Sequence, residues 1–197
     1  MNKCTFDFIK DIAFLNNYSG TIVEFGSRCF QKYNPRDIIN HKKYIGYDLD
    51  RGNGVDVTNI NNIPDCCADA IICSSMLEHD KEPEQTLNDI SRIMKPACKI
   101  LFTIPFNWPI HNYPNDYRRL TPDGLKLLLC KFKNVNCYGL GEKNNPHTVV
   151  GAVNHHTIPD IKKYYYEDGF IKGIIKNYFL TPAMFRSAKR IIHHENS

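Results

Sequence analysis

The feature that most constrains this chain is a short apolar strand that stops at a glycine. Residues 21–25 are strand-forming, Gly26 follows at once, and an acid, Glu24, stands two positions before the glycine. A second strand-like run ends in another acid, Asp48. In an α/β unit, a glycine turn lets backbone approach a ligand, and an acid after the second strand accepts hydrogen bonds from a ribose diol. The two motifs predict a nucleoside-containing cofactor across the carboxyl ends of parallel strands.

Strand-like and helix-like patterns alternate along the rest of the chain. Apolar runs predict strands at residues 20–25, 43–48, 55–57, 69–74, 99–104, 135–140 and 148–153. Helical spacing predicts helices at residues 5–16 and 83–95 and another from Pro122 through Leu129. The crossover at residues 28–40 should be short or irregular, because Pro35 disfavours helix in the residue before it.

This alternation favours a doubly wound, mostly parallel, Rossmann-like α/β sheet. The last two strands are joined without a helix, which indicates an antiparallel edge. We expect one domain over residues 1–157 and a C-terminal helical tail over residues 158–197. The tail carries apolar residues at helical spacing and several lysines and arginines. It is expected to pack on the domain or on a second subunit of a homodimer; contact with an anionic membrane surface is the alternative.

Composition narrows the classes of partner. A chain of 197 residues suffices for one domain with a sizeable core. The net charge is only +4, and no cluster of lysine and arginine precedes the tail, so there is no strong sign of a nucleic-acid partner. We find no apolar segment of membrane-spanning length and no signal-peptide pattern, and we therefore expect reduced thiols and a cytoplasmic location.

Metal binding is not expected from the sequence. None of the eight cysteines forms a Cys-x-x-Cys pair, which argues against a structural zinc site. His147, His155 and His156 raise the question again, but the side chains of adjacent residues such as His155 and His156 do not naturally converge. The sequence therefore predicts no metal site.

The order and spacing of several runs resemble the class I S-adenosylmethionine-dependent methyltransferases. These runs are Val23-Glu24-Phe25-Gly26-Ser27, Tyr44-Ile45-Gly46-Tyr47-Asp48, Asp69 to His79, Ser91 to Pro96 and Thr103 to Leu125. The Leu77-Glu78-His79 run and the Arg92…Lys95-Pro96 run resemble the branch that methylates small molecules. The last run is similar to a subset from sugar and polysaccharide pathways. The resemblance covers residues 20–153.

The resemblance implies a seven-stranded sheet whose last strand is antiparallel, with S-adenosylmethionine as the cofactor. The residues that it assigns to the cofactor are Glu24, Gly26, Ser27, Asp48, Leu49, Asn59, Ile60, Ser74 and Ser75. Within this set, Asp48 would bind the ribose hydroxyls and Asn59, with the Ile60 backbone, would lie near the adenine. Ser74 and Ser75 would line the methionine side and face the methyl acceptor.

The chain departs from the family pattern at two places. Arg28 and Phe30 stand where many relatives have glycine, so only Gly26 is left to approach the ligand closely. The adenine position is Asn59, where relatives often have aspartate, although asparagine still offers an acceptor to an exocyclic amine.

Methyl transfer from a sulfonium is an in-line displacement, in which the protein mainly supplies orientation. A hydroxyl acceptor also benefits from a general base, whereas a neutral amine needs only desolvation and alignment. The candidate bases are His111 and Asp116, which follow the strand predicted at residues 99–104, and His79, which follows the strand predicted at residues 69–74. All three lie at the edge of the sheet where ligands bind. The alternatives are that Glu78 and His79 orient their loop, that His111 belongs to a packed aromatic lid, and that Asp116 pairs with Arg119.

The remaining candidate residues would contact the substrate; they are Trp108, Tyr117, Arg118 and Arg119. If the acceptor is a nucleotide sugar, one of the two arginines could bind its phosphate bidentately. The sequence therefore predicts a methyltransferase that acts on an O or N atom of a small molecule, with a sugar or nucleotide sugar as the preferred class.

Three other functions stay open at this point. Because Arg28 and Phe30 replace glycines in the loop after the first strand, a catalytically silent cofactor-binding or scaffold protein on the same fold is possible. An RNA or protein methyltransferase would need a basic or extended docking surface. A nicotinamide-dependent oxidoreductase is weakly indicated, because Gly26 stands without a full Gly-x-Gly-x-x-Gly motif.

Overall fold

The structure is a computed structural model that describes residues 3–28, 33–111, 115–142 and 145–164. The described residues all belong to one compact unit that extends to position 165. The predicted tail therefore lies outside the described residues from position 165 onward, and the domain boundary at residue 157 stays a prediction. In the described part, no helix combines the length and the apolar character needed to cross a membrane.

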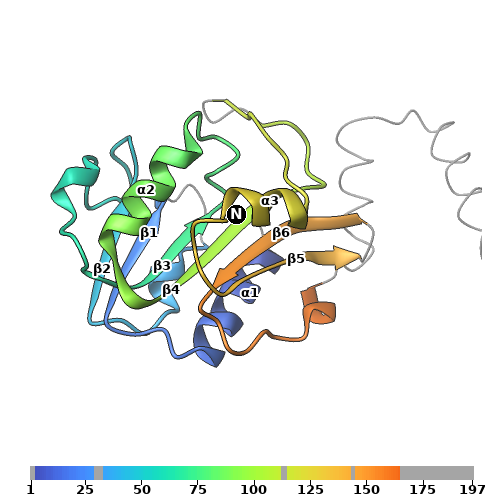
Figure 1. Ribbon diagram of the computed structural model, residues 1–197, viewed down its shortest axis with the longest axis horizontal. Helices are drawn as coiled ribbons and strands as arrows, with labels where there is room; N and C mark the ends of the chain where they lie inside the picture. The colour runs from blue at the N-terminus through green and yellow to red at the C-terminus, as the bar shows by residue number, and fades with distance from the viewer. Residues whose placement is uncertain (1–2, 29–32, 112–114, 143–144, 165–197) are drawn as a thin grey trace, which may run out of the picture. The chain divides into compact units, whose positions relative to one another are not determined.

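The described residues form a single six-stranded sheet in the order β2-β1-β3-β4-β6-β5 (Figure 1). The strands are β1 (Thr21–Phe25), β2 (Lys43–Tyr47), β3 (Ala68–Ser74), β4 (Met94–Pro105), β5 (Val135–Glu142) and β6 (Asn145–Val153). The first four are parallel to one another where they pair, whereas β6 is antiparallel to both β4 and β5. This confirms the predicted α/β class, the mostly parallel sheet and the antiparallel edge.

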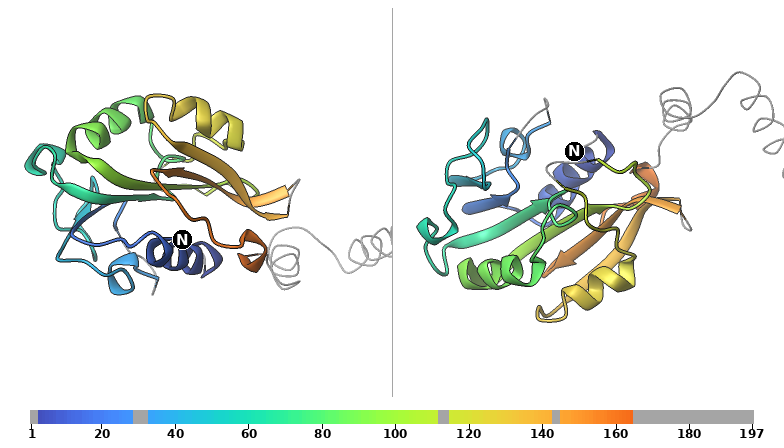
Figure 2. Two further views of the ribbon diagram at one scale, coloured as in Figure 1. Left: turned by 60° about the horizontal axis from the view of Figure 1, so that its bottom comes forward. Right: turned by 90° about the horizontal axis from the view of Figure 1, so that it is seen from above.

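The α-helices of the described residues cover the two faces of the sheet (Figure 2). Helix α1 (Lys3–Leu15) lies on one face, and helices α2 (Pro83–Ile93) and α3 (Pro122–Leu128) lie on the other. Helix α3 begins where predicted, because the Thr121 hydroxyl accepts a hydrogen bond from the Gly124 N–H at 3.1 Å. Short 3₁₀ turns occur at η1 (Pro35–Asp37), η2 (Ile60–Asn62) and η3 (Ile161–Tyr164).

The strand predicted at residues 55–57 does not form, so the sheet of the described residues has six strands instead of the predicted seven. Residues 55–57 make one parallel bridge, between Tyr47 and Val57. A side-chain hydrogen bond takes the place of a backbone ladder bond here, since the Asp56 carboxylate accepts the Gly46 N–H at 2.8 Å. The segment keeps only short backbone contacts with the edge of β2, including Asp56 N–H to the Gly46 carbonyl at 2.8 Å. The sequence pattern could not show that an aspartate would take the place of a backbone acceptor.

The end of helix α2 differs from the prediction, whereas the crossover between β1 and β2 agrees with it. Helix α2 ends at Ile93 and β4 begins at Met94, two residues before the predicted end of the helix. Pro96 explains the early end, because a proline disfavours helix in the residue before it. The crossover between β1 and β2 is irregular, as predicted, and its described part contains only the turn η1.

Each face of the sheet has its own buried core. On one face, Leu87 and Ile90 of α2 and Leu125 of α3 pack with strand residues such as Val23 and Ile71. On the other face, α1 packs Phe8, Ile9 and Ile12 against neighbouring strand residues, among them Ile22 and Ile72. Consecutive strand residues thus point to opposite cores, as expected for a sheet covered on both sides.

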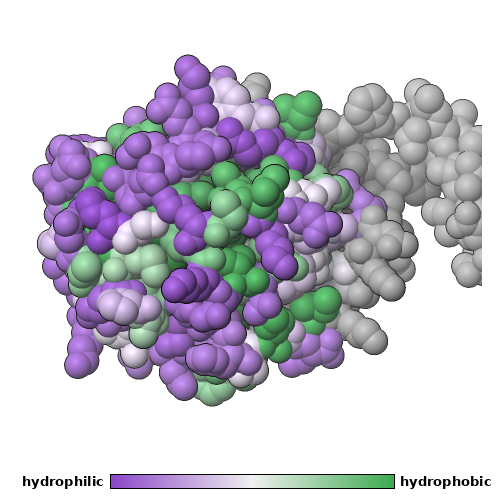
Figure 3. Space-filling model, viewed as in Figure 1, coloured by the Kyte–Doolittle hydropathy of each residue, from purple (hydrophilic) through white to green (hydrophobic). Residues whose placement is uncertain are grey.

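The surface is mixed in character. In the view of Figure 3, hydrophobic side chains gather over the region of α3 and polar ones surround them. Leu127 of that helix is 75% exposed. Single exposed apolar residues of this kind are normal for a folded chain.

Candidate cofactor and acceptor site

The turn after β1 requires a glycine. Gly26 has φ +73°, a left-handed conformation that a side chain disfavours. A Cβ atom there would also lie 2.9 Å from the Met76 Cβ and Cγ atoms. The Gly26 N–H donates to the Tyr47 carbonyl at 2.9 Å. This turn is therefore held between the end of β2 and the segment that follows β3.

Asp48 lies directly beside this turn, at the end of β2. Its carboxylate accepts hydrogen bonds from the Arg28 N–H at 3.3 Å and from the Asp50 N–H at 3.2 Å. Each oxygen keeps a further lone pair for a ligand hydroxyl. Leu49, the next residue, is 79% exposed. The structure thus brings together the two elements from which the sequence predicted a nucleoside site.

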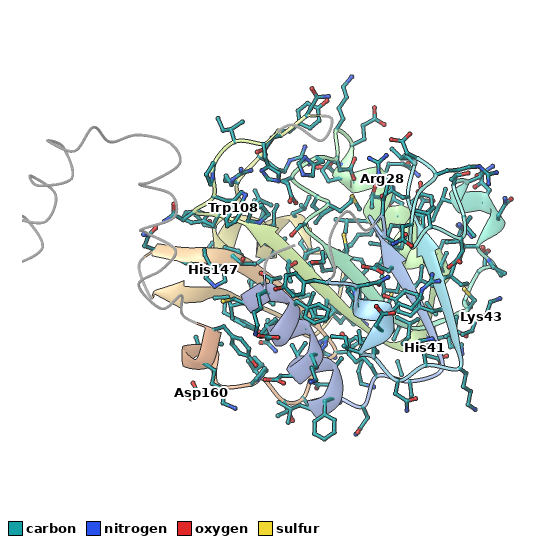
Figure 4. The ribbon with its side chains drawn as sticks, turned by 180° about the vertical axis from the view of Figure 1, so that it is seen from behind. Arg28, His41, Lys43, Trp108, His147 and Asp160 are labelled. Atoms are coloured by element: carbon teal, nitrogen blue, oxygen red, sulfur yellow. The ribbon has the colours of Figure 1, made fainter. Side chains whose placement is uncertain are left out.

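The Arg28 side chain packs onto the segment after β2. The Arg28 guanidinium pairs with Asp50 at 2.9 Å, and a Cβ on Gly52 would lie 2.8 Å from Arg28 Cδ. Figure 4 shows Arg28 toward the same upper side as Trp108, away from His41 and Lys43, which lie near the start of β2. Arg28 is thus bound to the loop after β2, which explains how the turn accommodates an arginine at this position.

Glu24 and Ser27, on either side of Gly26, are both buried. The Tyr44 hydroxyl donates to Glu24 Oε2 at 2.8 Å. Burial raises the pKa of Glu24 to about 7, although the Tyr44 hydrogen bond opposes the shift. The Ser27 hydroxyl has no hydrogen-bond partner among the described residues. An orphaned buried hydroxyl next to the Gly26 turn suits a group that accepts a hydrogen bond from a ligand or donates one to it.

Asn59 and Ile60 begin the turn η2 and are already engaged in the fold. Asn59 Oδ1 caps η2 by accepting the Asn61 N–H at 3.0 Å. The Arg92 guanidinium donates to the Ile60 carbonyl at 3.0 Å. The Asn59 oxygen retains one lone pair, so its assignment to the adenine stays a prediction.

Strand β3 ends at Ser74, whose hydroxyl lies 2.8 Å from the Thr103 hydroxyl of β4. Ser75 has φ +51°, an unusual conformation for a residue other than glycine, and its N–H donates to the Thr103 carbonyl at 2.8 Å. Such strain persists only where the surroundings fix the backbone. The strained residue turns the chain from β3 into the segment that carries Met76, Glu78 and His79.

Two predicted catalytic histidines meet beyond this turn. The rings of His79 and His111 have centroids 4.8 Å apart and cross edge to face. His79 Nδ1 donates to the Asn115 carbonyl at 2.5 Å. His111 Nδ1 lies 3.2 Å from the Pro109 carbonyl and 3.2 Å from Asp116 Oδ2. In both rings, the contacts leave Nε2 as the nitrogen available to a ligand.

The third predicted catalytic residue, Asp116, holds this loop together. It accepts two hydrogen bonds from the Arg119 guanidinium, one of them at 2.7 Å, and one from the His111 N–H at 3.0 Å. The Arg119 hydrogen bonds lower the pKa of Asp116 to about 2. Arg118 donates to the Leu77 carbonyl at 2.7 Å and to the Asp80 carbonyl. The alternative that Asp116 and Arg119 pair and fix the loop is therefore what the structure shows.

The aromatic residues of this loop differ in surroundings. The Tyr117 N–H donates to the Glu78 carbonyl at 2.7 Å, and its side chain is 49% exposed. The Trp108 carbonyl is 3.4 Å from the Arg119 guanidinium. The loop after β4 is thus joined by backbone hydrogen bonds to the loop after β3, and the predicted catalytic and substrate residues gather where the two loops meet.

Glu78 also belongs to this site, although its sequence pattern indicated only a role in orienting the loop. Its side chain is fully buried, and neither carboxylate oxygen makes a hydrogen bond to another described residue. Its Oε1 atom lies 3.7 Å from His79 Nε2. Burial raises the pKa of Glu78 to about 8. An acid next to a histidine at the end of a buried strand was the available signal, but sequence could not show that the acid would be buried without a hydrogen bond to another described residue.

His147 and His155 have structural surroundings. His147 Nε2 contacts the Tyr164 carbonyl at 2.9 Å, and His155 Nε2 contacts the Tyr18 hydroxyl at 2.7 Å. Both are buried, and burial lowers the pKa of His155 to about 4.

Comparisons with known proteins agree with this geometry. A family model described as a methyltransferase domain matches residues 41–102. An S-adenosylmethionine-dependent methyltransferase from Archaeoglobus fulgidus shares the fold with TM-score 0.57 and 14% identity, over 76% of this chain and 92% of that one. The 1,6-didemethyltoxoflavin-N1-methyltransferase of Burkholderia thailandensis, solved with S-adenosylhomocysteine, has TM-score 0.56 and 11% identity, over 76% and 78% of the two chains. No curated protein matches the sequence significantly.

The chain has the fold of solved S-adenosylmethionine-dependent methyltransferases, and its residues 41–102 match a methyltransferase domain model. These findings agree with the enzyme class and with the cofactor, S-adenosylmethionine, that the sequence predicts. The residues at the carboxyl edge fit that cofactor, because Gly26 leaves no side chain at the turn, Asp48 is placed beside it, and the Ser27 hydroxyl lacks a partner among the described residues.

Proposed function

We propose that the protein transfers the methyl group of S-adenosylmethionine to an oxygen or nitrogen atom of a small molecule, with a sugar or nucleotide sugar as the preferred acceptor. The observation that carries the proposal is the meeting of His79, His111 and Asp116 at the end of a segment that also contacts the Gly26 turn. The segment of residues 74–79 thus connects the Gly26 turn, which Met76 contacts, with the loop that carries His111 and Asp116, which His79 contacts.

The cofactor supplies an activated methyl group on sulfur, and the protein supplies orientation. In this proposal, Asp48 accepts hydrogen bonds from the ribose hydroxyls, and Ser74 and Ser75 line the path toward the acceptor. His111 activates the acceptor hydroxyl through Nε2, since Nδ1 is directed at Asp116 and Pro109. Burial lowers the pKa of His111, which keeps the ring neutral and able to accept a proton at neutral pH.

The choice of a sugar-like acceptor is supported by the resemblance of residues 103–125 and by the half-exposed ring of Tyr117. The arginines support a phosphate less directly, because Arg118 donates to two carbonyls and Arg119 is paired with Asp116. The phosphate of a nucleotide sugar would have to bind guanidinium groups that also donate to these carbonyls and to Asp116. An Arg119→Ala variant with unchanged affinity for every phosphorylated acceptor would remove this part of the proposal.

Cofactor binding is the first test. Calorimetric titration of S-adenosylmethionine should show micromolar binding, and Asp48→Ala should weaken it by about tenfold or more, because the ribose loses an acceptor worth about 1.4 kcal/mol. Asp37→Ala is the matched control, since Asp37 is an exposed aspartate of η1 and should bind as the wild type does. A folded wild type that binds no cofactor would favour the catalytically silent scaffold.

Acceptor activation is the second test. With an acceptor found by screening sugars and nucleotide sugars, His111→Ala should lower kcat by about 10²- to 10⁴-fold while cofactor affinity stays unchanged. His156→Ala serves as the control, because that histidine is exposed and outside the cluster. Wild-type kcat in His111→Ala would show that alignment alone drives the reaction, as it can for a neutral amine.

A further inference from the structure

Three potential metal ligands converge where the loops after β3 and β4 meet. Each of Glu78, His79 and His111 offers one ligand atom, and these atoms all lie within 4.8 Å of one another. Glu78 and His79 come from the β3 loop, whereas His111 comes from the β4 loop. Two imidazole nitrogens and one carboxylate oxygen are a ligand set that first-row transition metals bind readily.

The buried carboxylate of Glu78 is the strongest sign of a cation site. The side chain is 0% exposed, and both oxygens lack hydrogen bonds to other described residues. The charged side chains that act on it are Arg119 and Asp116, and these two are paired with each other. A buried carboxylate without a partner is costly, and it is rarely left so unless it is protonated or binds a metal.

The two histidines are oriented as metal-bound histidines are. A ligating imidazole normally donates its other N–H to a carbonyl or carboxylate, which fixes the tautomer and the ring. His79 Nδ1 donates to the Asn115 carbonyl at 2.5 Å. His111 Nδ1 contacts the Pro109 carbonyl and the Asp116 carboxylate. Both Nε2 atoms are thereby left as electron-pair donors, and His79 Nε2 lies 3.7 Å from Glu78 Oε1.

We infer that Glu78, His79 and His111 form a binding site for a divalent first-row transition-metal ion of the Zn²⁺ type. Solvent can reach the site, since the side chains of His79 and His111 are 14% and 34% exposed. Atoms that bind one such ion lie about 2.0–2.2 Å from it, and the three ligand atoms lie within 4.8 Å of one another. Three protein ligands leave a coordination position open, which is the pattern of a reactive site rather than a closed structural one.

A metal ion in this position changes the role of His111. An acceptor hydroxyl bound at the open position would release its proton to solvent more readily, because the cation stabilises the alkoxide, whose oxygen then attacks the methyl carbon as the bond from that carbon to the cofactor sulfur breaks. His111 would then act as a ligand, and Asp116 would position it. This step rests on the proposed function, whereas metal binding itself does not.

The test measures metal binding without cofactor or acceptor. The full-length protein, with the exposed Cys66 and Cys130 changed to serine to limit thiolate binding, is stripped with a chelator and titrated with Zn²⁺ by calorimetry. One ion per chain should bind. Glu78→Gln and His111→Ala should each abolish binding at concentrations that saturate the parent, and Asp116→Asn should weaken it about ten- to a hundredfold. Substitution with Co²⁺ should give a visible absorption band that the same variants lack.

The matched control is His156→Ala, which should bind as the parent does. Circular dichroism checks that each variant is folded, and the partly exposed His111 provides a variant that leaves the buried Glu78 in place. Absence of stoichiometric binding by the folded parent would overturn the inference, as would binding that neither Glu78→Gln nor His111→Ala affects. Titration with S-adenosylmethionine on the stripped protein is read separately, so failure of the metal site and failure of the proposed function are distinguishable.

Discussion

Glu24 and Glu78 are both buried carboxyl groups near the carboxyl edge of the sheet, and their surroundings differ. The Tyr44 hydroxyl donates to Glu24 at 2.8 Å, whereas Glu78 has no such partner among the described residues. Burial raises the pKa of Glu24 to about 7 and that of Glu78 to about 8. At the scale of single residues, the site therefore carries protonation states that exposed acids would not have.

A Glu24→Gln variant should change how stability depends on pH. The folded-state pKa of Glu24 is raised, so folding holds its proton at pH values where the unfolded chain releases it. Its contribution to stability is therefore complete below about pH 4.5 and is lost as the pH rises through about 7. The amide introduced by the substitution does not titrate, so the unfolding free energy of the variant relative to wild type should rise with pH, by at most about 1.4 kcal/mol per pH unit.

Urea unfolding between pH 5 and pH 8 measures this difference. His155, whose pKa is lowered to about 4, changes stability in the opposite direction, so wild type and variant must be compared at each pH. Glu84→Gln, at an exposed position of α2, is the control and should run parallel to wild type. Equal pH slopes for wild type and Glu24→Gln would show that Glu24 is ionised throughout the range.

At the scale of elements, the end of α1 is tied to the segment after β6 by one side chain. Asn16 Nδ2 donates to the Ile12 carbonyl at 2.9 Å and to the Thr157 carbonyl at 2.7 Å. Asn16 Oδ1 accepts the His156 N–H at 3.0 Å and the Thr157 N–H at 3.2 Å. A single amide thus satisfies both donors and acceptors where a helix and a strand segment end.

We expect Asn16→Ala to destabilise the protein by about 2–4 kcal/mol, because buried backbone groups lose their partners. The midpoint of urea unfolding measures the loss. Asn53→Ala is the matched control, because Asn53 is exposed in a turn between β2 and η2. It should change stability by about 0.5 kcal/mol or less. A comparable loss in both variants would mean that the Asn16 hydrogen bonds are not specific supports of this junction.

At the scale of the whole molecule, residues 1–165 contain both cores and the candidate site. The described helices that cover the two sheet faces all lie within this unit. A chain that ends at residue 165 should therefore unfold cooperatively, with the same denaturant midpoint as the full chain and the same affinity for S-adenosylmethionine. Loss of cooperative unfolding would show that residues 166–197 complete the core.

The truncated chain also tests the predictions made for the tail. Comparison of the two chains by sedimentation would show whether residues 166–197 are needed for a homodimer. Liposome flotation of the two chains would test contact with an anionic membrane, and equal flotation of both would remove that alternative. The cytoplasmic location stays a prediction that neither measurement addresses.

Local sequence patterns determined the elements and their class. Apolar runs showed where the strands lie because a strand that is covered on both faces is a short, nearly continuous run of apolar residues. Thr121 at the N-cap and Pro122 in the first turn set the start of α3. Gly26 and Asp48 could be assigned to one edge from their places in the chain, since the carboxyl ends of parallel strands meet there. These inferences depend only on neighbours in sequence and on the handedness of α/β units.

Tertiary structure alone decided the rest. Residues 55–57 failed to become a strand because Asp56 supplied a side-chain acceptor to Gly46. Glu78 and His111, far apart in sequence, came together because Tyr117 and Arg118 anchor one loop to the carbonyls of the other. Whether a carboxylate is buried without a hydrogen-bond partner, and whether two imidazole rings meet edge to face, depends on how the loops lie against each other in space. Sequence patterns carry that information only through long-range packing, which is why the acceptor side of the site could be named in part but not assembled.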